Sequence, residues 1–266
     1  MKLAFYWVDA FTDRVFGGNP AGVVPLWSWI DDGLMQSIAA ENNLSETAFF
    51  VPKGEGFHLR WFTPTTEVPL CGHATLAAGH VVLHAIDPAR KAVLFETLSG
   101  KLGVTRDGDR LALDFPALPA APVATLPKGL AESLGASVVE LHRAGDNFLV
   151  VLGSEGEVRD LEPDFAALAK VDGRAGYIVT AAGGDVDFVS RYFAPQYGIP
   201  EDPVTGSAHC TLAPYWAKRL GKTSLDARQV SRRGGVIACT LVGDRVTIAG
   251  HAVTYLTGTL EVPAHP

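Results

Sequence analysis

The chain of 266 residues repeats itself once, and this internal duplication limits the folds that it can adopt. Residues 60–64 (RWFTP) return as residues 191–195 (RYFAP), 131 positions later. Residues 69–74 (PLCGHA) return as residues 203–208 (PVTGSA), 134 positions later, so the second copy holds three additional residues. Self-similarity at one fixed offset is typical of repeated structural units. Because the offset is close to half of the chain length, it predicts two pseudo-symmetric lobes rather than a solenoid.

A third repeated segment and the pattern of apolar residues indicate the same unit. Gly100 precedes residues 108–110 (GDR) at the spacing at which Gly235 precedes residues 243–245 (GDR). An acidic start and one apolar face predict an amphipathic helix over residues 31–43. Alternating or β-branched runs predict strands near residues 5–9, 21–25, 48–51, 59–62, 93–96, 102–106 and 111–114, and again near 148–152, 177–180, 188–193, 236–242, 246–249 and 256–262.

Each half also contains a helix that begins at a glycine. Residues 73–84, after Gly72, are apolar almost all round, which is typical of a buried helix. The counterpart after Gly206 has Gly221 as its expected C-cap, and Pro214 is expected to kink it or to break its hydrogen-bond ladder. The sequence therefore predicts an α+β fold in which each lobe is a curved mixed β-sheet or barrel wrapped around a buried central helix.

Domain boundaries are expected where the composition changes. Residues 117–128 are proline-rich and lie between the two halves, so they are the expected linker. The expected N-terminal lobe is residues 1–116 and the expected C-terminal lobe is residues 129–257. The final strand, residues 258–266, is expected to pack back on the N-terminal lobe.

The composition excludes several classes of partner. Lys and Arg number 22 against 29 Asp and Glu, which gives a net charge of −7, and no basic run attracts nucleic acid or a membrane surface. No stretch approaches the roughly 20 apolar residues of a spanning helix, and the N-terminus becomes charged before a signal-like apolar run develops. Three cysteines form no CxxC pair. We therefore expect a small-molecule ligand and reduced thiols in a cytoplasmic protein.

The two helix starts are the expected place for chemistry. A helix N-terminus presents unpaired N–H groups and partial positive charge, and Gly72 and Gly206 allow a small carboxylate to approach closely. Duplication explains the residues that the copies share, so divergence between copies indicates function. The copies diverge at three pairs of equivalent positions near these starts, namely Cys71 and Thr205, His73 and Ser207, and Val68 and Asp202.

Six motifs follow one another over most of the chain, namely residues 9–12 (DAFT), 18–21 (GNPA), 43–47 (NLSET), 60–64 (RWFTP), 71–75 (CGHAT) and 201–207 (EDPVTGS). In this order they resemble the motifs of the PhzF-like family of phenazine biosynthesis proteins. That family is similar in fold to diaminopimelate epimerase and proline racemase. The resemblance implies two lobes that each hold a buried helix, an active site in the interlobe cleft, no cofactor and a homodimer.

The resemblance also implies roles for particular residues. Family members of known chemistry isomerise a dihydro-hydroxyanthranilate by moving a proton along an allylic system, with one glutamate as base and then acid. Glu46 matches that glutamate. A carboxylate withdrawn from water has a raised pKa, which lets it take and return a proton. The other expected site residues are His73 and Asp202 as catalytic groups, Ser45, Gly72, Gly206 and Ser207 as substrate contacts, and Cys71 and Asn19 as accessory groups.

Each catalytic candidate also has a purely structural interpretation. Glu46 is then an ordinary glutamate at a strand edge, and Asp202 shapes the turn over residues 200–203. His73 is then a buried, hydrogen-bonded residue at a helix start. In favour of function, the helix dipole there disfavours the cation and suits a neutral imidazole that donates or relays a proton. His80 and His84 are four residues apart on one helix, but no third ligand is evident, so no metal site is expected.

Two further functions stay open. Racemases and epimerases of the resembled fold carry a cysteine before each helix-start glycine, whereas this chain has Cys71 in one half and Thr205 in the other. A threonine hydroxyl is too weak an acid for stereoinversion through two thiols. The Cys/Thr combination resembles hydroxyproline dehydratases, so a cysteine-dependent epimerase or dehydratase is one alternative. A non-catalytic small-molecule binding protein is the other.

Overall fold

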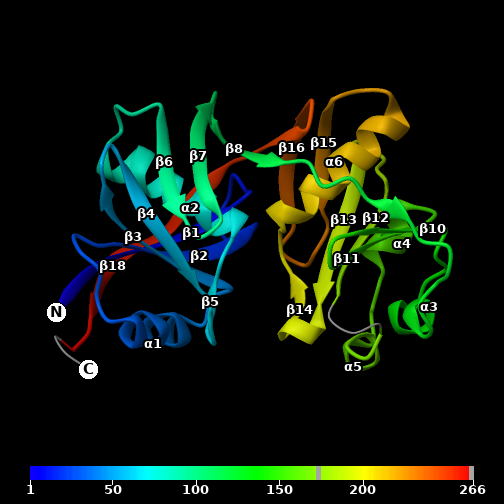
Figure 1. Ribbon diagram of the computed structural model, residues 1–266, viewed down its shortest axis with the longest axis horizontal. Helices are drawn as coiled ribbons and strands as arrows, with labels where there is room; N and C mark the ends of the chain where they lie inside the picture. The colour runs from blue at the N-terminus through cyan, green and yellow to red at the C-terminus, as the bar shows by residue number, and fades with distance from the viewer. Residues whose placement is uncertain (172–174, 264–266) are drawn as a thin grey trace. The chain divides into compact units, whose positions relative to one another are not determined.

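The chain forms two compact units in the computed structural model, which describes residues 1–171 and 175–263 (Figure 1). Unit 1 comprises Met1–Asp114 together with the C-terminal segment from Ala249, and unit 2 comprises Phe115–Ile248. Each unit combines a mixed β-sheet with one long, buried helix. No helix in the described part of the chain is long and apolar enough to cross a membrane.

Unit 1 is a mixed sheet around a central helix, α2 (Gly72–Val81). Its strands pair in the order β18-β1-β2-β3-β4-β6-β7-β8, and the pairs β2–β3 and β4–β6 are parallel. Its other elements are β1 (Lys2–Ala10), β2 (Asn19–Pro25), α1 (Asp32–Asn42), β3 (Glu46–Lys53), β4 (Gly56–Phe62), β5 (Glu67–Val68), the π-helical turn η1 (Val82–Ile86), β6 (Ala92–Thr97), β7 (Gly100–Asp107), β8 (Arg110–Pro116) and β18 (Ala252–Glu261).

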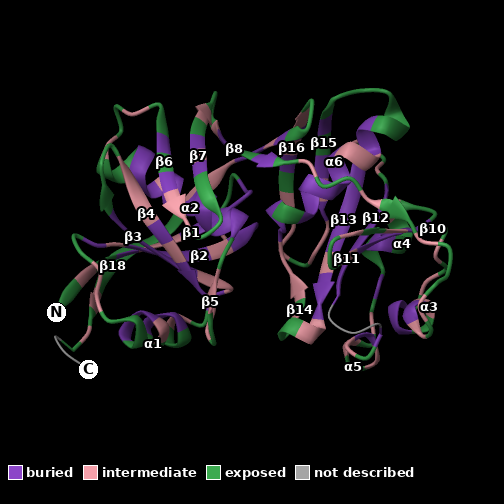
Figure 2. Cartoon of the chain, in the orientation of Figure 1, coloured by how far each residue is buried: buried purple, intermediate pink, exposed green. Residues whose placement is uncertain are grey.

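Helix α2 is the core of unit 1. Its apolar sequence leaves no polar face for solvent, and every residue except His80 is buried (Figure 2). The helix contacts strands β18, β1, β2 and β3 and also β7, further along the sheet. The sheet must therefore curve around it.

Unit 2 repeats this plan around α6 (Gly206–Leu220). Its strands pair in the order β9-β10-β11-β12-β13-β15-β16, and β11–β12 and β13–β15 are the parallel pairs. Its other elements are β9 (Ala121–Pro122), α3 (Leu130–Leu134), β10 (Glu140–Ala144), β11 (Asn147–Val151), α4 (Glu155–Arg159), α5 (Phe165–Leu168), β12 (Gly176–Ala182), β13 (Phe188–Ala194), η2 (Pro195–Tyr197), β14 (Ile199–Asp202), β15 (Ser224–Gln229), β16 (Gly235–Val242) and β17 (Arg245–Gly250).

Strand register shows how closely the two units correspond. Trp61 of β4 pairs with Val68 of β5, and its equivalent Tyr192 of β13 pairs with Asp202 of β14. The three additional residues of the second copy lie inside this second hairpin, where the 3₁₀ turn η2 also comprises three residues. The alignment of Val68 with Asp202 that the repeats indicate is therefore a structural equivalence.

An arginine–glutamate pair is built into the same hairpin of both units. In unit 1, Nε and Nη2 of Arg60 donate to the two carboxylate oxygens of Glu67 at 2.8 and 2.7 Å. In unit 2, Arg191 binds Glu201 in the same bidentate way at 2.7 and 2.9 Å. Parallel N–H···O bonds of this kind fix orientation as well as charge. Each pair fastens its short strand to the longer one.

The expected domain limits need correction at both ends of unit 2. Strand β18 pairs with β1 from Ala252 onward, so residues from Ala249 belong to unit 1 and the C-terminal lobe does not extend to residue 257. Residues 117–128 are not a free linker, because Ala121 and Pro122 pair with β10 inside unit 2. Residues 264–266 of the expected final strand lie outside the described residues.

Pro214 does not break α6. The helix runs on to Leu220 and ends at Gly221, which adopts a left-handed φ of 68° as the expected C-cap. Proline removes the N–H that would bind the carbonyl four residues earlier. That carbonyl, on Cys210, instead accepts a hydrogen bond of 2.9 Å from the backbone N–H of Leu118. The expected linker segment thus supplies the hydrogen-bond donor that Pro214 lacks.

Close packing of α2 predicts a stability difference between two glycines. A Cβ at Gly79 of α2 would lie 2.6 Å from Cγ1 and 2.8 Å from Cβ of Val104, a stiff β-branched side chain, whereas nothing lies within 4 Å of a Cβ at Gly103. Gly79→Ala should lower the free energy of unfolding by about 1–3 kcal/mol, because overpacking outweighs the gain in helix propensity. Urea unfolding measures this. Gly103→Ala is the control and should stay within about 0.5 kcal/mol of the unaltered chain.

Candidate active site

Glu46 stands at the junction between α1 and β3. Helix α1 ends at Asn43, which adopts a left-handed φ of 49° and donates its backbone N–H to the carbonyl of Ala39. Leu44 is then buried, and Glu46 opens β3 in parallel register with Ala21 of β2. The Glu46 side chain is only 12% exposed. The 43–47 motif thus turns the chain sharply and delivers one carboxylate to a largely dry position.

His73, the second residue of α2, contacts residues of three sequence motifs, which are residues 18–21, 43–47 and 71–75. Its Nε2 lies 3.2 Å from Oε2 of Glu46. Its Nδ1 lies 3.1 Å from Nδ2 of Asn19 and 3.4 Å from Sγ of Cys71. Glu46, His73, Asn19 and Cys71 therefore form one cluster in unit 1. Motifs that are separate in the sequence meet there.

Burial determines the charge of His73. Loss of water around the ring lowers the pKa of His73 to about 3, and a hydrogen bond with the backbone of Pro20 opposes this only in part. The imidazole is therefore neutral at physiological pH. Its 3.2 Å approach to Glu46 is accordingly a polar contact and not an ion pair. A neutral imidazole in this position can hold or relay a proton without adding charge to the site.

Asn19 reaches the cluster through an unusual backbone turn. Gly18 has a φ of +60°, and a Cβ there would lie 2.1 Å from the carbonyl oxygen of Ala10, so only glycine fits. The buried Asp9 accepts a hydrogen bond of 2.9 Å from the backbone of Phe16 and closes the same loop. The first two sequence motifs therefore shape the loop that places Asn19 beside His73.

The same cluster has the ligand types of a metal site. One ligand atom each from Glu46, Cys71 and His73 lies within 4.8 Å of the others. However, Glu46 faces Nε2 of the ring and Cys71 faces Nδ1. The lone pairs of the two ring nitrogens point in different directions. An ion bound at Nε2 would lie on the Glu46 side of the ring, and an ion bound at Nδ1 would lie on the Cys71 side. The arrangement fits proton handling better than shared coordination. His80 and His84 stack on each other at 4.4 Å and have contacts to Thr254 and Arg106.

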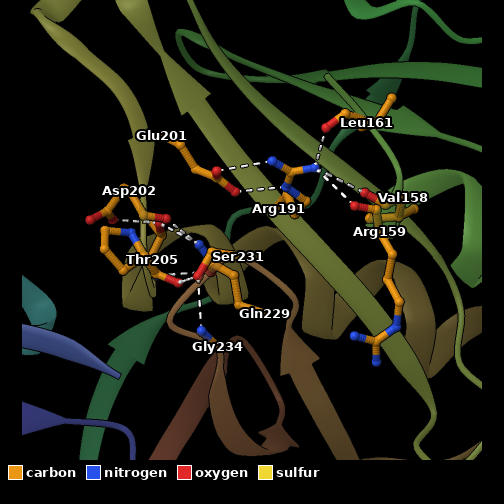
Figure 3. Close-up of polar contacts among 11 residues, drawn as sticks. Val158, Arg159, Leu161, Arg191, Glu201, Asp202, Thr205, Gln229, Ser231 and Gly234 are labelled. Atoms are coloured by element: carbon orange, nitrogen blue, oxygen red, sulfur yellow. Dashed lines mark hydrogen bonds and ion pairs between the residues drawn. The ribbon is translucent and has the colours of Figure 1, made fainter. Parts of the chain in front are cut away.

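Unit 2 arranges Asp202 around the start of α6. The Thr205 hydroxyl, at the N-cap, donates a hydrogen bond of 2.5 Å to Oδ2 of Asp202 (Figure 3). Neither Thr205 nor its equivalent Cys71 caps its helix with its side chain. Gly206 is buried and Ser207 is exposed. In unit 1, Gly72 is buried at the start of α2, and Ser45 is half-buried next to Glu46.

The sequence reasoning missed part of the surroundings of Asp202. Gln229, at the end of β15, is 1% exposed and hydrogen-bonds to both Asp202 and Thr205. Ser231, just beyond it, donates to the carbonyl of Pro203 at 2.7 Å. No motif marked these residues. The one signal that could have indicated Gln229 is its position at the end of β15. There, a polar residue continues the series of alternate positions that are buried.

Comparisons with known proteins bear on the family and the fold. The PhzC–PhzF family of phenazine biosynthesis-like proteins matches residues 8–258. An uncharacterised isomerase of Pseudomonas aeruginosa is 53% identical over 262 residues, which cover 98% of this chain and 100% of that protein. A crystal structure of a PhzF-family phenazine biosynthesis protein from Enterococcus faecalis is 45% identical with a TM-score of 0.95, over 98% of this chain and 100% of that one.

A more distant likeness concerns the fold alone. A hydroxyproline epimerase from Agrobacterium vitis is 14% identical with a TM-score of 0.59, over 97% of this chain and 91% of that one. Together these likenesses confirm the predicted family resemblance and the predicted α+β fold class.

Two buried histidines predict an acid-sensitive fold. Burial lowers the pKa of His73 to about 3 and that of His209 to about 4, against 6.5 for the free group. Below pH 6.5 the unfolded chain therefore binds protons that the folded chain does not. The free energy of unfolding should fall with decreasing pH, by up to about 1.4 kcal/mol per pH unit for each histidine.

Urea titrations between pH 7 and 5 measure this slope. The slope of the free energy of unfolding against pH reports how many more protons the unfolded chain binds than the folded chain. His209→Gln should lower that number by about one, whatever its effect on stability at pH 7. His84→Gln removes a histidine from an exposed position instead and is the comparison variant. An unaltered slope in the His209 variant would contradict the assignment of a neutral, buried imidazole.

Proposed function

Because this chain belongs to the phenazine biosynthesis-like PhzC–PhzF family, whose relatives include isomerases, we propose that it isomerises a small carboxylate by moving a proton, with Glu46 as general acid and base. The observation that carries this proposal is the pairing of a 12% exposed carboxylate with a neutral, buried imidazole. A base withdrawn from water is suited to abstracting a proton from carbon.

The proposed reaction balances with one residue. The Glu46 carboxylate takes a proton from a substrate carbon, and the electron pair of that C–H bond moves into the adjacent unsaturated system. The protonated Glu46 then returns the proton to a different carbon on the same face. The substrate keeps its atoms and charge, and the enzyme returns to its starting state. His73, which contacts Glu46, orients the carboxylate, and Asn19, which contacts His73, holds the imidazole; both keep the site polar without a net cation.

The substrate carboxylate has candidate partners at the helix starts. The side chains of Cys71 and Thr205 do not cap α2 and α6, and first-turn N–H groups at a helix start are donors suited to an anion. The Thr205 hydroxyl holds Asp202 near the start of α6. We assign Asp202 to an amine or hydroxyl of the substrate. That both helix starts serve the same substrate stays a prediction, as do the homodimer, the independence of any cofactor and the cytoplasmic location.

One contact favours a second candidate function. Sγ of Cys71 lies 3.4 Å from Nδ1 of His73, and a thiol beside an imidazole is the usual arrangement of an activated cysteine. A cysteine-dependent epimerase or dehydratase would use this pair. Against it, the equivalent position in unit 2 is Thr205, whose hydroxyl is engaged with Asp202. The two functions assign the moving proton to different atoms.

Two substitutions separate these functions. Glu46→Gln keeps size and hydrogen bonding but removes the group that accepts a proton, so catalysed exchange should fall by about 10²–10⁴-fold. Cys71→Ala removes the thiol and little volume, and activity should stay within about tenfold. The measurement is deuterium incorporation from D₂O into a panel of cyclic and aromatic amino acids and related carboxylates, followed by NMR.

Binding of the same acids provides the control. Line broadening of the acid's signals should persist with the Glu46→Gln variant, because the helix starts and Asp202 are unaltered. If the Cys71 variant were inactive and the Glu46 variant active, the thiol-based function would replace the one proposed. Binding without any exchange by the unaltered chain would instead indicate a non-catalytic binding protein.

A further inference from the structure

Gln229 connects three groups at the start of α6. Its Oε1 accepts the backbone N–H of Thr205 at 2.9 Å, and its Nε2 donates to the backbone carbonyl of Asp202 at 2.7 Å. The same Nε2 lies 3.2 Å from Oγ1 of Thr205 (Figure 3). The amide orientation is fixed by chemistry, since only its oxygen can accept an N–H and only its nitrogen can donate to a carbonyl. The side chain is 1% exposed.

These bonds form a directed chain toward Asp202. One Nε2 hydrogen of Gln229 serves the Asp202 carbonyl, and the other serves the Thr205 oxygen. The Thr205 hydroxyl hydrogen then points to Oδ2 of Asp202, at 2.5 Å. Hydrogen bonds in series polarise one another, and more so away from water. Gln229 therefore fixes both the backbone that carries Asp202 and the donor that holds its carboxylate.

The equivalent residues of unit 1 do not form this arrangement. Phe188 of β13 pairs with Ala227 of β15, as Phe57 of β4 pairs with Phe95 of β6 in unit 1. Two residues further along β15 and β6, Gln229 therefore corresponds to Thr97. The Thr97 hydroxyl donates to the carbonyl of Gly100 at 2.8 Å and closes its own hairpin. In contrast, the arginine–glutamate pair next to Asp202 occurs in both units and is shared scaffold. Asp202, Thr205 and Gln229 thus form a set that is particular to unit 2.

The turn after β15 reinforces the same segment. Ser231 donates to the carbonyl of Pro203 at 2.7 Å and accepts the backbone N–H of Gly234 at 3.1 Å (Figure 3). On the other side, Arg191 holds Glu201 and also donates to the carbonyl of Leu161 at 2.7 Å. The residues around Asp202 are therefore fixed from both neighbouring strands, and Gln229 is the member that reaches the carboxylate through Thr205.

We propose that Gln229 is a positioning residue for the reaction, which sets the Asp202 carboxylate and the first turn of α6 in one fixed geometry. This inference rests on the proposed function, in which Asp202 contacts the substrate. Gln229 acts through Asp202 and Thr205 and touches no reacting atom. A displacement of a contacting carboxylate by about 1 Å is enough to slow a positioned reaction by about 10²-fold.

Two substitutions at Gln229 test the proposal. Gln229→Met keeps the length but removes all three hydrogen bonds, and should lower the rate of deuterium incorporation by about 10–100-fold. Gln229→Glu keeps the acceptor for Thr205 but places a second oxygen against the Asp202 carbonyl, where only a protonated carboxyl can donate. Its rate relative to the unaltered chain should therefore rise as the pH falls.

A matched control separates positioning from general stability. Gln196 of η2, at the turn of the β13–β14 hairpin, donates away from Asp202, to the carbonyls of Leu168 and Val171, both at 3.2 Å. Gln196→Met also loses part-buried hydrogen bonds of a glutamine amide, but it should leave the rate and its pH dependence unchanged. In an Asp202→Asn background, Gln229→Met should have a much smaller effect than in the unaltered chain. Equal effects in both backgrounds, or equal rates for the two methionine variants, would overturn the proposal.

Backbone amide exchange provides a readout that does not need activity. Gln229→Met should speed exchange of the Thr205 N–H by at least tenfold, and Gln229→Glu should leave it protected. If the unaltered chain incorporates no deuterium into any acid, the proposed function fails, and this measurement alone decides whether Gln229 holds the start of α6. Unchanged protection in the methionine variant would overturn the inference even if Glu46 proves catalytic.

Discussion

The burial of an almost wholly apolar helix is the constraint on which the rest of the structure depends. Helix α2 offers water no polar face, so unit 1 must surround it with strands on several sides. The helix start is the one part of its backbone that has N–H groups without internal partners. Burial of the helix therefore places the backbone donors of its first turn next to His73, Cys71 and the residues that contact them. The position of the chemistry follows from the packing of the core.

The duplication made much of this predictable. Repeated segments gave the two units, the paired helices and the equivalence of Val68 with Asp202, which strand register later matched. The motifs also brought Glu46, His73 and Asn19 together as candidates before any distance was known. Hydrophobic periodicity indicates which face of a helix or strand is buried, and repeats indicate which positions in the two units are equivalent. These two properties determine the core of each unit.

The remainder was unpredictable because it depends on contacts between segments that lie far apart in the sequence. Nothing local shows that Leu118 would satisfy the carbonyl freed by Pro214, and so the proline-rich segment was expected to be a linker. Strands β10 and β15 are short and carry charged residues on their exposed positions, which hid them. Gln229 has no motif of its own, and its importance appears only when its three partners are known.

The pairing of β1 with β18 has a consequence for how the protein is made. The first strand of the chain completes its sheet only with the last, and the N-terminal amine even donates to the carbonyl of Val262. All of unit 2 is translated between these partners. While the ribosome is still at work, unit 2 can fold as a contiguous piece, but β1 waits with one edge unpaired. The nascent chain therefore carries an open strand edge until residues 252–261 have been made, and the pairing of those residues with β1 closes the sheet of unit 1.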